Sequence, residues 1–118
     1  MGTARLGAAA VALPGGRQVM VMGGDDGSSK ELDTVEIFTL DEDPGGVGRW
    51  TQAAPMQTPR KHPAAAGLLD GRVVVAGGYF TPPIPEGDTK AADARLALGA
   101  SKGNILASAE VFMPGEAR

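Results

Sequence analysis

Short apolar runs separated by glycine-rich segments fill the first half of the chain, and each run predicts a β-strand. Residues 8–13 are small and apolar, and a Pro-Gly-Gly turn follows them. Residues 18–22 form a nearly continuous apolar run, the pattern of a strand buried on both faces. Residues 35–39 alternate in the half-buried manner, and residues 50–53 begin a fourth strand. Four short strands with tight or glycine-rich connections predict an antiparallel meander.

The same order of features occurs a second time, beginning at Arg60 instead of Arg5. Each arginine precedes an alanine-rich run, an aliphatic strand and a pair of glycines, then a loop and a strand that carries glutamate and phenylalanine. These repeated residues are Gly23, Gly24, Glu36 and Phe38 in the first copy and Gly77, Gly78, Glu110 and Phe112 in the second. A repeat of this length with a diglycine after an aliphatic strand predicts a propeller-type array.

Two repeated features carry structural expectations of their own. The alanine runs suit innermost strands that crowd around a central axis, although alanine also favours helix on propensity alone. Pro14 and Pro63 border these runs, so strand is the stronger prediction. The glycine pairs are expected to supply positive φ or a close backbone approach. The repeated glutamates are expected to accept hydrogen bonds from backbone or arginine, because a buried unpaired carboxylate costs several kcal/mol.

These features resemble the kelch repeat in their order and spacing. The matching elements are the small-residue strand, the turn at Asp70-Gly71-Arg72, the glycine pair, the Val-Glu-Ile-Phe strand, Trp50, and the boundary at residues 55–60. The resemblance implies an all-β fold of antiparallel four-stranded kelch blades, each one blade of a β-propeller around a central channel. It also implies that Trp50, Phe38 and Phe112 are packing residues.

The repeat divides the chain into about two blades of a partial propeller. Residues 1–59 are predicted to form the first kelch blade, and residues 60–118 a second, incomplete blade with an insertion at about 81–104. The insertion begins as a proline-rich extended loop, and a short helix over residues 89–98 is possible within it. Such an insertion serves either recognition or no function beyond a surface excursion.

A closed propeller typically needs 4–8 blades. Two blades would leave apolar faces open at both ends, so the sequence favours a fragment of a longer protein. The alternative is a homo-oligomer that completes a propeller, with three copies giving six blades.

Charge and composition narrow the classes of partner. The net charge is −3, so no basic field attracts nucleic acid or an anionic membrane. No apolar run approaches the ~18 residues of a membrane span. The N-terminal residues loosely resemble a secretory signal, but they align with residues 60–68 in mid-chain, so a strand is the better interpretation. We expect no signal peptide, and a cytoplasmic location is favoured, although the absence of cysteine leaves the compartment undecided.

The connection between blades and the loop between the second and third strands contain the candidate binding residues. The resemblance implies that both lie on one face that meets the ligand. Arg60, Lys61 and His62 could form a cationic rim there, or the repeated arginine could anchor the turn, which its repetition favours. The acidic loop at 25–33 lacks the spacing of a calcium site. The candidate partner-binding residues are Arg5, Asp25, Asp26, Arg60, Lys61, His62 and Tyr79.

The resulting prediction is a kelch-type protein–protein interaction module without catalytic activity, cofactor or metal, whose protein partner is unknown. The alternative is a fragment of a kelch-fold enzyme, a sugar isomerase or mutarotase or an oxidase-like propeller, whose active site needs further blades. A cysteine-linked tyrosine, as in the copper oxidases of this fold, would need a cysteine beside Tyr79, and the chain has none. With His62 as its one histidine, it also has no histidine cluster for a metal.

Overall fold

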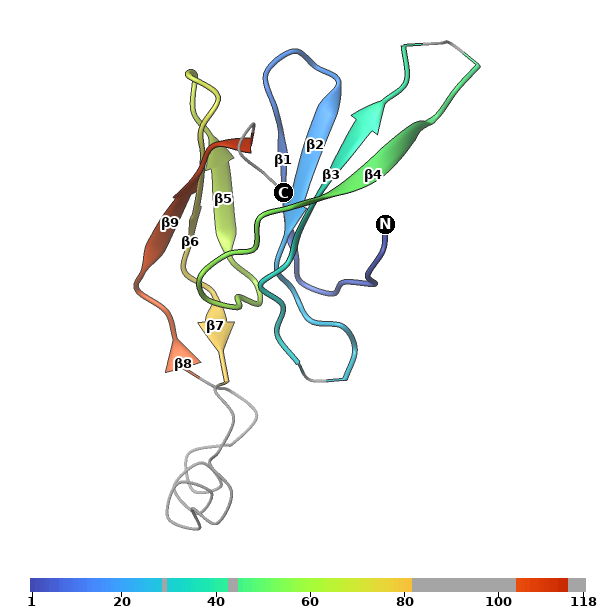
Figure 1. Cartoon of the computed structure of the whole chain (residues 1–118). Coiled ribbons are helices and arrows are strands. Elements are labelled where there is room, and N and C mark those ends of the chain that lie inside the picture. Colours follow the sequence, from blue (N-terminus) through green and yellow to red (C-terminus); the bar gives the residue numbers. More distant parts are fainter. Residues whose placement is uncertain (29, 43–44, 82–103, 115–118) are drawn as a thin grey trace, which may run out of the picture.

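The computed structural model describes residues 1–28, 30–42, 45–81 and 104–114. Its elements are β-strands, which form two main antiparallel sheets lying side by side (Figure 1). The first sheet has the order β1-β2-β3-β4, and the second has the order β5-β6-β9. The predicted all-β fold with an antiparallel four-stranded blade is confirmed. The predicted helix at 89–98 lies outside the described residues.

The strands of the first sheet follow the chain as an up-and-down meander. They are β1 (Ala9–Ala12), β2 (Gln18–Met22), β3 (Val35–Leu40) and β4 (Gly48–Ala53). The central register pairs Val19 with Phe38, and Phe38 with Trp50. The Phe38 and Trp50 ring centroids are 5.2 Å apart, so these two aromatics pack across β3 and β4.

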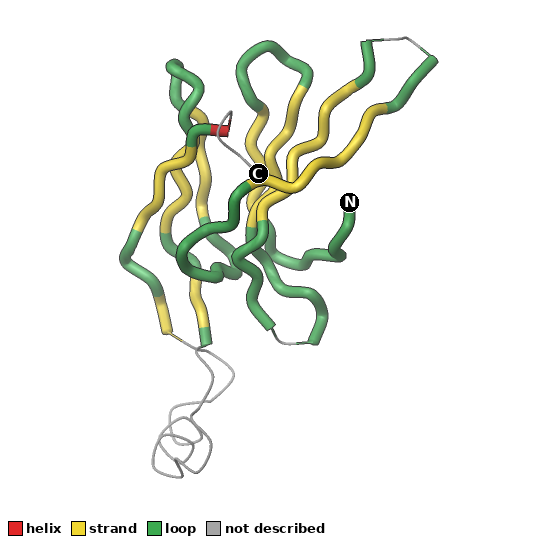
Figure 2. The backbone as a smooth tube through the Cα atoms, in the orientation of Figure 1, coloured by secondary structure: helices red, strands yellow, loops and turns green. Residues whose placement is uncertain are grey.

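The second sheet has the same arrangement with three strands. They are β5 (Ala64–Gly67), β6 (Val73–Ala76) and β9 (Ala109–Phe112). Between β6 and β9, the short strands β7 (Tyr79–Phe80) and β8 (Asn104–Ile105) pair with each other at the base of the insertion (Figure 2). The sequence patterns did not predict β7 and β8, because two-residue strands carry no periodicity.

The hydrophobic core lies between the two sheets. Alternate residues of β2 and β3 point toward the second sheet, and alternate residues of β6 point back toward them, as the two-residue period of a strand requires. The buried apolar residues are Val11, Leu13, Met20, Met22, Val35, Ile37, Met56, Val73 and Val75. On the opposite face of each sheet, the described residues are less covered, and Val19, Trp50 and Val111 are each more than a third exposed.

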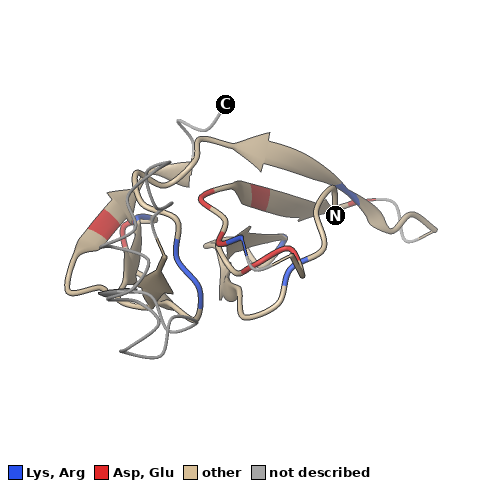
Figure 3. Ribbon diagram, turned by 90° about the horizontal axis from the view of Figure 1, so that it is seen from below, with Lys and Arg blue, Asp and Glu red and all other residues tan. Residues whose placement is uncertain are grey.

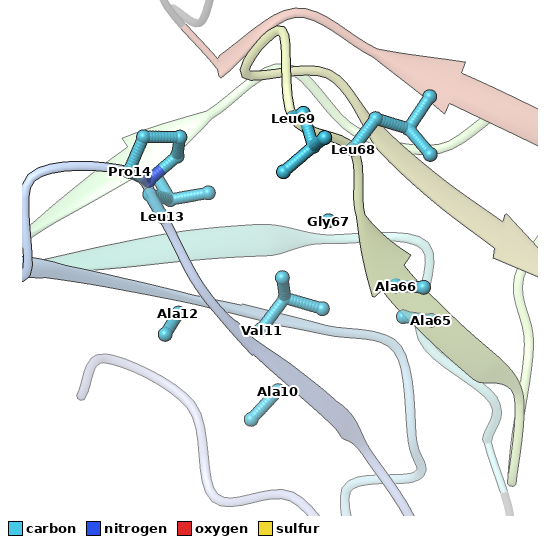
Figure 4. Close-up of a pocket in the computed structure, with 10 residues that line it drawn as sticks. All are labelled: Ala10, Val11, Ala12, Leu13, Pro14, Ala65, Ala66, Gly67, Leu68 and Leu69. Carbon is cyan, nitrogen blue, oxygen red and sulfur yellow. The ribbon is translucent and has the colours of Figure 1, made fainter.

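The small residues of β1 and β5 let the two sheets approach each other (Figure 4). A Cβ added to Gly67 would lie 3.3 Å from Val11 Cγ1, closer than ordinary packing. An open groove remains between these strands, and its walls are small or aliphatic: Ala10, Val11, Ala12, Leu13, Pro14, Ala65, Ala66, Gly67, Leu68 and Leu69. The alanine content of both strands thus serves the close approach of neighbouring sheets.

Candidate functional site

The loop between β2 and β3 and the segment before β5 meet at one end of the molecule. The Gly24 N–H donates to the Arg60 carbonyl at 2.7 Å, and the Lys61 and Tyr79 backbones form an isolated β-bridge. Gly24 and Gly78 hold φ values of 90° and 83°, which only glycine adopts without strain. Figure 3 shows basic and acidic segments close together on these loops. We call the residues at this end, 24–28, 30–33, 61–62 and 79, the junction face.

Arg60 is fully buried behind the junction face and binds the second sheet from within. Its guanidinium donates to the Gly77 and Ser108 carbonyls at 3.0 and 2.9 Å, and to Ser108 Oγ at 2.9 Å. The Glu110 carboxylate accepts from Arg60 at 3.2 Å and also from the Gln57 and Thr58 N–H groups. The guanidinium therefore links three parts of the second sheet: the segment before β5, the glycine pair after β6, and strand β9.

The two terminal nitrogens of Arg5 make the corresponding contacts in the first sheet, whereas its Nε has no hydrogen-bond partner among the described residues. Arg5 donates to the Gly23 and Thr34 carbonyls at 2.9 and 3.0 Å, to Thr34 Oγ1 at 2.9 Å and to Glu36 Oε2 at 3.0 Å. The Gly2 N–H donates to the other Glu36 oxygen at 2.7 Å. Burial alone would raise the pKa of Glu36, but the bonds from Gly2 and Arg5 outweigh it, so that pKa lies below its usual value of 4.5.

These positions bear on the two interpretations of the repeated arginine. The Arg5 and Arg60 side chains are 1% and 0% exposed, so neither guanidinium is available at the surface. Each guanidinium makes its contacts within its own sheet. This supports the interpretation that the repeated arginine anchors the turn. Neither arginine is included in the binding face proposed below.

Lys61 and Asp25 connect the two loops of the junction face by an ion pair. Lys61 Nζ lies 2.8 Å from Asp25 Oδ2, and Asp25 is almost fully buried. The hydrogen bond from Lys61 lowers the pKa of the Asp25 carboxyl, and the same bond raises the pKa of Lys61. Lys61 Nζ also lies 5.9 Å from the Tyr79 ring centroid. The structure thus brings together Asp25, Lys61 and Tyr79 from three separate segments.

His62 has a backbone conformation that is rare for a residue with a side chain. Its φ is 55°, and the equivalent position in the first copy is Gly7, with φ 72°. The His62 N–H donates to the Gly7 carbonyl at 2.8 Å. A Cβ on Gly7 would lie 2.8 Å from His62 Cε1, so the first copy leaves room for the imidazole of the second. The ring is exposed and lies 6.0 Å, centroid to centroid, from Tyr79.

Two carboxylates complete the junction face. Asp26 is exposed, and the Ser28 hydroxyl and N–H donate to it, which lowers the pKa of Asp26. Glu31 accepts a hydrogen bond from the Thr81 N–H at 2.7 Å and ties the β2–β3 loop to β7. Sequence reasoning counted Glu31 in the acidic loop but did not single it out, because the contact joins residues that are distant in the sequence.

The described residues contain no group of histidine, aspartate and glutamate side chains placed to hold a metal ion. Among the same residues, no helix has the length and apolar character needed to cross a membrane. The junction face offers a histidine, a tyrosine and carboxylates on loops held by buried arginines.

Comparison with known proteins agrees with the architecture. A family model described as the kelch motif matches residues 4–57, which begin just before Arg5 and include β1 to β4. A search of curated proteins finds no match. The matched residues include the arginine, the glycine pair, the glutamate and the tryptophan whose contacts are described above. The chain thus carries a kelch motif in residues 4–57, which supports a kelch-repeat family.

Proposed function

We propose that this chain is a protein-interaction module with no catalytic activity of its own, and that the junction face binds its protein partner. Kelch repeats generally serve protein interaction. We also propose that residues 1–59 and 60–118 are successive blades, the second with an insertion at about 81–104. The equivalent arginine–glutamate contacts of Arg5 and Arg60 support this division.

The observation that carries the proposal is the conformation of His62. A left-handed backbone costs a residue with a Cβ about 1–2 kcal/mol, and the first copy avoids this cost with Gly7. The imidazole is exposed, so burial in the core does not offset the strain. A strained residue whose ring stays at the surface beside Tyr79 is suited to contact a partner.

The charges of the junction face shape what it can bind. Lys61 is neutralised by Asp25, so the ammonium is not free to act as a cationic rim. The exposed groups are the Asp26 carboxylate, the His62 imidazole and part of Tyr79. Such a surface suits a partner that presents hydrogen-bond donors and an apolar or aromatic group, and it does not select for a strongly acidic one.

Two substitutions test this face without disturbing the backbone. His62→Gly places at this position the residue that the equivalent site already uses, and Asp26→Ala removes an exposed carboxylate. Partners captured by the unmodified chain are identified by mass spectrometry, and their affinities are measured with purified proteins. We expect the double variant to lose about tenfold or more in affinity.

Arg72→Ala is the matched control, because Arg72 forms an exposed ion pair at the β5–β6 turn, at the opposite end of the sheet (Figure 1). This variant should bind as the unmodified chain does. Equal affinity of the double variant and the control would contradict the proposed face. Reproducible turnover of a sugar by the purified chain would contradict the absence of catalysis.

A further inference from the structure

Each copy carries a row of three directly paired residues at the end of its sheet. Backbone pairing aligns the residue after the arginine, the residue after the second glycine, and the residue opposite it on the returning segment. The row is Leu6, Asp25 and Glu31 in the first copy and Lys61, Tyr79 and Ile105 in the second. Directly paired residues of antiparallel strands carry their side chains on the same face, so the two rows can be compared position by position.

The two rows differ in chemistry at their second and third positions. The first copy has carboxylates there, and both accept hydrogen bonds or an ion pair from the second copy. The second copy has a half-buried tyrosine and Ile105, which is 90% exposed and lies outside the hydrophobic core. An isoleucine with that exposure contributes little to stability by burial. Together with the Tyr79 ring and the exposed His62 imidazole, it forms an apolar and aromatic surface.

The side of the β7–β8 ribbon that carries this surface faces the first sheet. Lys61 Nζ contacts Asp25 at 2.8 Å and lies 5.9 Å from the Tyr79 ring centroid. The Thr81 N–H donates to Glu31 at 2.7 Å and holds the ribbon against the β2–β3 loop. Ile105, paired directly with Tyr79, therefore extends the junction face between the two described sheets.

The charge of the junction face is negative. It contains four carboxylates and two lysines, a net charge of −2: Asp25, Asp26, Glu31, Asp33, Lys30 and Lys61. Within the described part of the chain, the ion pair of Lys61 with Asp25 is the only one that these groups form. Lys61 shows how this face holds a cation, between a carboxylate and an aromatic ring. Asp26 is the exposed carboxylate that is left for a cation of the partner.

We propose that the junction face, extended by Ile105, binds a segment of the partner that carries a basic residue close to an aliphatic or aromatic one. The apolar side chain covers Ile105 and the exposed part of Tyr79, and the basic side chain pairs with Asp26. An acidic segment is disfavoured because it would meet a face of the same sign. This inference rests on the junction face being the binding surface, as proposed above, and adds the chemistry of the partner and the role of β8.

The test selects peptides on the complete chain from a library of random peptides displayed on phage. We expect the enriched sequences to place lysine or arginine near leucine, isoleucine or an aromatic residue. An enriched peptide is then synthesised with a fluorescent label, and its affinity is measured by fluorescence anisotropy at several salt concentrations. Because one contact is an ion pair at the surface, the affinity should fall as the salt concentration rises.

Three variants of the chain assign the contacts. Ile105→Ser removes an exposed apolar side chain and should lower the affinity about tenfold. Leu69→Ser is the matched control, because Leu69 is a fully exposed aliphatic residue in the turn between β5 and β6, at the opposite end of the sheet (Figure 1). It should leave the affinity unchanged. Asp26→Asn should lower the affinity and flatten its salt dependence. Circular dichroism checks that all three keep their β-sheet.

Two results would overturn this inference and leave the junction face as the binding surface. One is the enrichment of acidic or purely polar peptides whose binding His62→Gly weakens. The other is a set of basic and apolar peptides whose binding His62→Gly weakens but Ile105→Ser does not. Failure of the proposed function itself gives a different result. In that case no peptide is enriched on the folded chain, or the enriched peptides bind every junction-face variant equally well, and both proposals are wrong.

Discussion

The buried guanidinium of Arg60 should contribute far more to stability than its distances alone suggest. Arg60→Met keeps much of the side-chain volume and removes the charge and every hydrogen bond of the guanidinium. Glu110 would keep its bonds from the Gln57 and Thr58 N–H groups, but the Gly77 and Ser108 carbonyls would lose their side-chain donor. The change therefore breaks a buried hydrogen-bond network and leaves these carbonyl acceptors without their side-chain donor.

The expected loss follows from the burial of the pair. Removing one partner of a buried ion pair costs about 3–5 kcal/mol, because the remaining charge stays desolvated. The Arg60 and Glu110 side chains are 0% and 13% exposed, which places this pair in that class. A domain of this size is stable by only about 5–15 kcal/mol, so the variant should lose a large part of its free energy of unfolding.

Urea unfolding followed by circular dichroism measures the effect, and Arg72→Met is the matched control. The Arg72–Asp70 ion pair is shorter, 2.7 Å against 3.2 Å, but its side chains are 49% and 52% exposed. Such a surface pair contributes about 0–1 kcal/mol. With a slope of about 2 kcal/mol per molar urea, Arg60→Met should lower the midpoint by about 2 M and the control by less than about 0.5 M. Equal shifts at unchanged slope would refute the argument that burial decides the contribution of these arginines.

Two further predictions concern acid sensitivity and the glycine pairs. Because the folded-state pKa of Glu36 is lowered, its contribution to stability is present above about pH 4.5 and is lost as pH falls through the folded value. Unfolding curves between about pH 6 and about pH 3 should therefore be less pH-dependent for Glu36→Gln, and an unchanged dependence would contradict the assigned cause. Gly78→Ala should destabilise far more than Gly71→Ala in thermal unfolding. Both glycines have positive φ, but a Cβ on Gly78 would lie 2.6 Å from the Lys61 carbonyl, and one on Gly71 meets nothing within 4 Å. Similar losses of stability in the two variants would show that the positive φ, and not the close contact, determines the destabilisation.

The architecture was predictable because the strands carry their own signals. Residues 18–22 and 35–39 have strand periodicity, and the structure places β2 and β3 there, with β3 extending one residue further to Leu40. The start of β4 was predicted two residues late, at Trp50, because Gly48 and Arg49 have no strand preference and are held by pairing with β3. Pairing across the sheet, not local propensity, determines such ends.

The arrangement at the junction face was less predictable. The repetition of Arg5 and Arg60 favoured a structural role, but nothing in the sequence gives the depth of burial of a guanidinium. The ion pair of Lys61 with Asp25 joins the loop after β2 to the segment before β5, and its formation depends on how the two sheets pack. The left-handed backbone of His62 also depends on the fold, although its alignment with Gly7 was a signal that the sequence contained.

Comparison of the two copies separates residues that maintain the fold from residues that distinguish one blade from the other. Arg5 and Arg60 are identical, and each is buried in an ion pair with the glutamate of its own sheet, so this position serves the fold. The next two positions differ, because Leu6 and Gly7 in the first copy become Lys61 and His62 in the second. A residue that only completed the fold at the second of these positions would be glycine, as in the first copy, since φ is positive in both. The chain instead keeps a histidine with positive φ at the surface, and this difference between the copies supports the role that we propose for His62.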